Sequence, residues 1–77
     1  MSRQIQDQNF LVWEVYSTGG THGFSEEPFV MFHCLTQRDL RPRRIRLGRD
    51  EGEAQRLVAE ATDAELLAML QRSQELP

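Results

Sequence analysis

The sequence predicts a small α+β domain, a three-stranded antiparallel sheet followed by two C-terminal helices packed on one face (βββαα). Two observations predict it. Residues 10–48 contain three short segments rich in β-branched and aromatic residues, separated by turn-forming residues. Residues 50–70 then change to the apolar spacing of amphipathic helices. At 77 residues, we expect one domain over 10–77 with a thin core.

The three strands follow from local composition. FLVWEVYS, residues 10–17, alternates along a β-branched and aromatic run, and residues 18–28 hold three glycines and a proline, as in a loop. Residues 28–36 are apolar on both sides, as in a central strand, and residues 43–48 alternate arginine with Ile45 and Leu47. Residues 1–9 show no period, so the sequence predicts a flexible N-terminal tail there.

Two capping boxes predict two helices. Asp50 with Glu53, and Thr62 with Glu65, have the spacing of an N-cap residue and its partner three positions later. The second box restarts the helix, so we expect a bend between two helices. Their apolar stripes are Ala54, Leu57, Val58 and Ala61, and then Leu66, Leu67, Met69 and Leu70.

Strand alternation assigns the core. The side chains that we expect inside are Leu11, Trp13, Val15, Val30, Phe32, Cys34, Ile45, Leu47, Leu57, Val58, Leu66, Leu67 and Leu70. Two short helices cover only one face of a sheet, so the other face should stay open. An apolar patch left open on a small protein usually marks an interface. The predicted interaction residues are Val12, Tyr16, Phe29, Met31, His33, Arg44 and Arg46, with Glu14 among them.

Two alternatives remain for that face. The N-terminal tail or the loop at 18–28 folds over it, or a partner covers it. The partner we expect is a second copy of the chain, forming a homodimer, or a larger protein.

The charge is uneven. The net charge is −3, yet residues 38–49 hold six arginines against one aspartate. This band suggests an alternative function, a nucleic-acid-binding regulator whose polyanion-binding residues would be Arg41, Arg43, Arg44, Arg46 and Arg49. The acidic chain and the lack of an aromatic–basic RNA-binding signature count against it. A solvated strand edge is the plainer interpretation of the band.

Other motifs have structural interpretations. The GxxG pattern at 20–23 is flanked by strands, without the helices that nucleic-acid clamps of this type require. His33 and Cys34 are adjacent on a strand and point to opposite faces, so we expect no metal site and a buried Cys34. The acidic pairs, such as Glu26 and Glu27, find no base or oxyanion partner. We therefore expect no catalytic, cofactor-binding or metal-binding residues.

The resulting hypothesis is a non-enzymatic protein-interaction or accessory module that uses the open sheet face. The leucine-rich last helix could instead be a partner helix, although core packing explains its spacing. The absence of an apolar signal-like start, together with a single cysteine, leads us to expect a cytoplasmic protein. No apolar run is long enough for a membrane span, so we expect no membrane partner.

Overall fold

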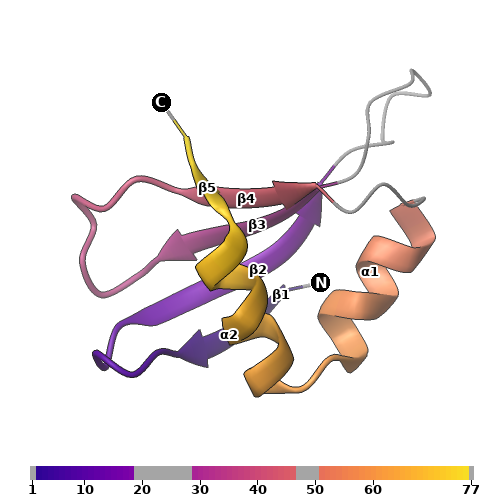
Figure 1. Ribbon diagram of the computed structural model, residues 1–77, viewed down its shortest axis with the longest axis horizontal. Helices are drawn as coiled ribbons and strands as arrows, with labels where there is room; N and C mark the ends of the chain where they lie inside the picture. The colour runs from indigo at the N-terminus through magenta and orange to yellow at the C-terminus, as the bar shows by residue number, and fades with distance from the viewer. Residues whose placement is uncertain (1, 19–28, 47–50, 77) are drawn as a thin grey trace.

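The computed structural model describes residues 2–18, 29–46 and 51–76. They form an antiparallel sheet with two helices near the C-terminus (Figure 1). In chain order the elements are β1 (Ser2–Gln6), β2 (Val12–Thr18), β3 (Phe29–Cys34), β4 (Arg43–Arg46), α1 (Glu51–Glu60), α2 (Asp63–Arg72) and β5 (Gln74–Glu75). The strands are neighbours in the order β1-β2-β3-β4-β5. The α+β class is therefore confirmed.

The strand count differs from the expected three, because the sheet has five strands. The first additional strand, β1, lies in the stretch 1–9 that was predicted to be a flexible tail. It pairs with β2 along its whole length, from Ser2 opposite Tyr16 to Gln6 opposite Val12. Ile5 is its only apolar side chain and is buried. A single inward apolar residue leaves no periodic apolar pattern in the sequence, so this edge strand was not predicted.

The second additional strand, β5, is two polar residues long and pairs with β4. A contact between distant parts of the chain holds it in place. The guanidinium of Arg43 donates from Nε to Ser73 Oγ (2.8 Å) and from Nη2 to the Ser73 carbonyl (2.6 Å). Ser73 is buried at the end of α2, and its hydroxyl donates to the Leu70 carbonyl. This contact directs the chain from the helix to the sheet edge.

The core lies between the sheet and the helices. Of the predicted core residues, eight are buried and four are partly buried against the core, while Leu47 lies outside the described residues. Ala54, Ala61 and Met69, which were predicted on the apolar stripes of the helices, are also buried, and so is Ile5, which was not predicted. Val15, Val30 and Phe32 are fully enclosed. Cys34 is buried, as expected for a small core residue.

The break between the helices was predicted correctly. At the start of α2 the Thr62 hydroxyl accepts from the Glu65 amide (3.1 Å), and the Glu65 carboxylate accepts from the Thr62 amide (2.9 Å). The hydrogen bonds from Thr62 lower the pKa of Glu65 because they favour its charged form. The corresponding box at Asp50 lies outside the described residues.

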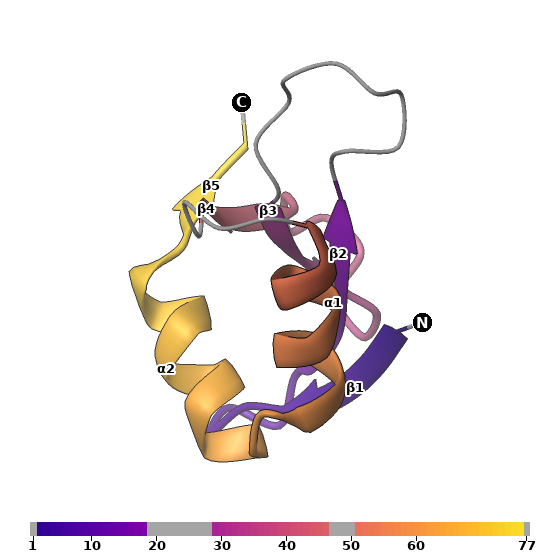
Figure 2. The ribbon, with the colours of Figure 1, turned by 90° about the vertical axis from the view of Figure 1, so that its right-hand side faces the viewer.

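Both helices lie on the same side of the sheet (Figure 2). α1 contacts β1, β2 and β3, and α2 contacts β1 and β4. None of the described helices is long and apolar enough to cross a membrane. Because both helices lie on one side, the opposite side of the sheet has no covering helix or strand within the described residues.

Candidate interaction surface

The open face is the sheet face opposite the helices. The strand register places on it the predicted interaction residues Val12, Tyr16, Phe29, Met31, His33, Arg44 and Arg46 together with Glu14. It also adds Ser2, Gln4, Gln6, Thr18 and Gln74 as a polar surround. Sequence alternation thus placed every predicted residue on the correct side.

The apolar centre of this face is Tyr16 and Met31, which are directly opposite each other on β2 and β3. Phe29 lies on the same side of β3, two residues before Met31. All three are partly exposed. Val12 is separated from them by the cross-strand pair Glu14 and His33. The apolar patch is therefore compact and contains three residues.

Two arginines border the patch on β4. Arg46 is directly opposite Phe29, and Arg44 is opposite Met31. Their guanidinium carbons lie 5.5 Å and 4.5 Å from the centroid of the Phe29 ring. Cations at this distance over an aromatic face gain about 0.5–1 kcal/mol at exposed sites. The Phe29 ring is therefore engaged by cations of its own chain.

The opposite border of the patch is acidic and polar. Glu14 lies on β2, and its carboxylate accepts a hydrogen bond from the Ser2 hydroxyl (3.2 Å). Among the described residues of the open face, two arginines stand against this single acid. The described residues of the face thus carry a net positive charge on a chain whose net charge is −3.

The arginine band does not form one surface. Arg43 is on the helix side of the sheet and donates to Ser73. Arg41 precedes β4 and borders a pocket on the helix side. Arg49 lies outside the described residues. Of the five predicted polyanion-binding residues, the structure brings only Arg44 and Arg46 together on the open face.

His33 and Cys34 do not share a site. His33 is exposed on the open face, whereas Cys34 is buried and its sulfur accepts from the Gln37 amide (3.4 Å). Within the described residues, no group of three or more His, Cys, Asp or Glu residues could hold a metal ion. The GxxG pattern at 20–23 and Glu26-Glu27 lie outside the described ranges.

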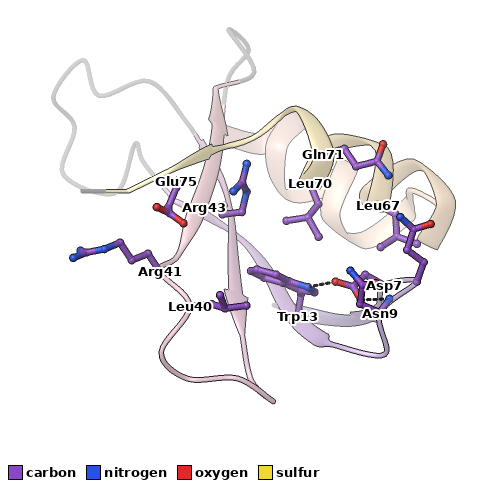
Figure 3. A pocket seen from close by; sticks show the side chains of 11 residues that line it. Asp7, Asn9, Trp13, Leu40, Arg41, Arg43, Leu67, Leu70, Gln71 and Glu75 are labelled. Atoms are coloured by element: carbon purple, nitrogen blue, oxygen red, sulfur yellow. Dashed lines mark hydrogen bonds between the residues drawn. The ribbon is translucent and has the colours of Figure 1, made fainter.

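A pocket that no sequence motif indicated lies on the helix side (Figure 3). We call it the Trp13 pocket; its volume is about 330 Å³. Its lining residues are Asp7, Gln8, Asn9, Trp13, Leu40, Arg41, Arg43, Leu67, Leu70, Gln71 and Glu75. The Trp13 ring lies between Leu40 and Asp7, below the α2 side chains Leu67 and Leu70. Four separate segments build it, so no local motif could have indicated it.

Asp7 organises one wall of this pocket. Its carboxylate accepts from Trp13 Nε1 (2.9 Å), from the Asn9 amide (2.8 Å) and from the Leu11 amide (3.0 Å). Burial alone would raise the pKa of Asp7, but these three hydrogen bonds outweigh it and lower the pKa below the ordinary value. Asp7 therefore stays ionised and fixes the orientation of the indole ring.

The turn after Asp7 contains an unusual residue. Phe10 has a backbone φ of 65° and is 78% exposed. Left-handed backbone costs a residue with a Cβ about 1–2 kcal/mol. The hydrogen bonds from the Asn9 and Leu11 amides to Asp7, on both sides of Phe10, help to hold this conformation.

Comparison of the chain with protein-family models, with curated proteins and with solved structures finds no match.

Proposed function

We propose that this chain is a non-enzymatic interaction module that docks onto an acidic surface of a larger protein through its open sheet face. One observation carries the proposal: the apolar patch of Tyr16, Phe29 and Met31 lies on a sheet face with no covering layer in the described chain. A contiguous apolar patch left open on a small protein typically marks a binding site. The tail that might have covered the face instead forms β1, in the plane of the sheet.

The charges on the face favour a larger partner over a second copy. Two copies placed face to face would bring four arginines together with two glutamates, because each face carries Arg44 and Arg46 against Glu14. A partner with acidic residues around an apolar centre avoids this repulsion. Arginine and aromatic side chains are also enriched at protein interfaces.

A matched pair of variants tests this proposal. Met31→Glu places a charge in the centre of the patch, and Ala68→Glu places the same charge on an exposed position of α2. We expect the wild type and Ala68→Glu to retain the same partner in affinity purification, and Met31→Glu to lose it. The partner should then be purified and its affinity for the three proteins measured, with a loss of about tenfold or more for Met31→Glu.

The outcomes separate the alternatives. A homodimer seen by light scattering and lost in Met31→Glu would make the second copy the partner. A monomer that binds the same proteins with or without Met31→Glu would contradict the proposal.

The alternative function is polyanion binding, which is favoured by the position of Arg44 and Arg46 beside Phe29. Base stacking would require displacement of these arginines from the Phe29 ring, and Arg43 is turned away. Binding of single-stranded oligonucleotides or heparin at low salt, weakening steeply as salt is added, would support it. If neither binds at low salt, polyanion binding is excluded.

A further inference from the structure

Phe10 and the Trp13 pocket have properties that the open face does not explain. Phe10 is the only large hydrophobic residue of the described chain that is exposed, at 78%. It follows directly after Asp7, Gln8 and Asn9, three residues that line the Trp13 pocket. The exposed ring thus directly follows one wall of the Trp13 pocket in the turn between β1 and β2.

The pocket is large enough for a phenyl ring. An apolar cavity of about 150 Å³ takes up benzene, and the Trp13 pocket has about 330 Å³. Its apolar surfaces are Trp13, Leu40, Leu67 and Leu70.

The Asp7 carboxylate contacts both the wall of the Trp13 pocket and the turn that carries Phe10. One carboxylate oxygen accepts from Trp13 Nε1 and fixes the pocket wall. The other accepts from the Asn9 and Leu11 amides, which flank Phe10. The left-handed backbone at Phe10 is thus maintained although the ring gains no burial in its own chain. Strained conformations of this kind concentrate at functional sites.

We infer that two copies of the chain associate by exchanging Phe10, each ring entering the Trp13 pocket of the other copy. In a dimer with two-fold symmetry, the Phe10 ring of each copy meets the Trp13 pocket of the other. Because Phe10 directly follows the pocket residues Asp7, Gln8 and Asn9 in the turn between β1 and β2, one axis beside this turn brings both contacts together. Two aromatic anchors form a small interface, so the dimer is weak and depends on concentration. It leaves the open face of each copy available.

Two variants test the roles of the Phe10 ring and the Trp13 pocket independently. Phe10→Asn removes the ring and keeps the backbone, because asparagine tolerates left-handed φ. Gln71→Phe fills the pocket of its own chain from an exposed position on α2. Phe10→Tyr and Gln71→Ala are the matched controls, which keep the ring and the open pocket. Thermal unfolding by circular dichroism confirms that each variant is folded.

Analytical ultracentrifugation and the fluorescence of Trp13, the single tryptophan of the chain, provide the two measurements. We expect the wild type, Phe10→Tyr and Gln71→Ala to associate as concentration rises, with a parallel change in Trp13 emission. Phe10→Asn and Gln71→Phe should each associate at least about tenfold more weakly. A mixture of these two should associate more strongly than either alone, because one ring then meets one open pocket.

Three results would overturn the inference. The first is a wild type that remains monomeric with constant Trp13 emission. The second is a dimer that Phe10→Asn leaves intact, and the third is a mixture that recovers no association. A dimer sensitive to Met31→Glu but not to Phe10→Asn would place self-association on the open face. Failure of Phe10 exchange leaves the docking proposal untouched, because Met31 and the Trp13 pocket lie on opposite sides of the sheet.

Discussion

At the scale of single residues, Asp7 shows how one side chain can fix both a turn and a pocket wall. Its position in the sequence gives no hint of this, since Trp13 and Leu11 reach it only after the β1–β2 hairpin has formed. An ionised carboxylate that accepts three hydrogen bonds is stabilised relative to its protonated form, and the lowered pKa of Asp7 is the consequence. The protein should therefore depend on the charge of this residue.

We predict that Asp7→Asn lowers the free energy of unfolding at neutral pH by about 1–2 kcal/mol, since hydrogen bonds to a charged group are lost. The pKa of Asp7 is lower in the folded than in the unfolded chain. Its contribution is therefore complete above the unfolded pKa and is lost as pH falls through the folded pKa. Urea unfolding near neutral pH and near about pH 3 should show the difference between wild type and variant shrinking in acid. A difference that stays constant with pH would contradict this role.

At the scale of elements, Arg3 connects β1 to the junction of the helices. Its Nη1 donates to the Val58 carbonyl (3.1 Å) and to the Ala61 carbonyl at the end of α1. Its Nη2 pairs with Asp63 in the first turn of α2 (2.5 Å). The last carbonyls of a helix lack intrahelical donors and carry partial negative charge, so a cation there is favourable. An edge strand with one apolar residue thus gains a polar attachment to the helical layer.

We predict that Arg3→Ala lowers the free energy of unfolding by about 1–3 kcal/mol, because two carbonyls lose a charged donor. Asp63→Asn is the matched control. It removes only the ion pair, whose acid is two-thirds exposed, and should cost less than about 1 kcal/mol. Chemical denaturation measures both. Equal losses in the two variants would show that the ion pair, and not the helix end, is what Arg3 stabilises.

At the scale of the whole molecule, the sheet separates two surfaces with different chemistry. The helix side holds the core and the Trp13 pocket, and the other side holds the apolar patch with Arg44 and Arg46. If both proposals hold, a dimer formed through Phe10 presents two open faces to the outside. Two linked copies would then bind a partner with two acidic sites more tightly than one copy does.

Val30 and Met31 are neighbours on β3 and test this two-sided organisation. Val30 is fully enclosed on the helix side, and Met31 is partly exposed on the open face. We predict that Val30→Glu prevents folding, because it buries an unpaired charge. Met31→Glu should change the unfolding temperature by only a few degrees, or about 0.5 kcal/mol. A large loss for Met31→Glu in thermal unfolding would mean that another part of this chain covers the face.

The sequence by itself determined what depends on near neighbours in the chain. Alternation in β2, β3 and β4 assigned side chains to two faces, and the Thr62–Glu65 box placed the start of α2, because both signals span only a few residues. The tertiary structure alone decided what depends on distant contacts. Backbone pairing makes β1 and β5, two mostly polar segments, the edge strands of the sheet. The fold also places the Arg43 side chain against Ser73. It also assembled the Trp13 pocket from four segments, because closure of the sheet against α2 is what brings them together.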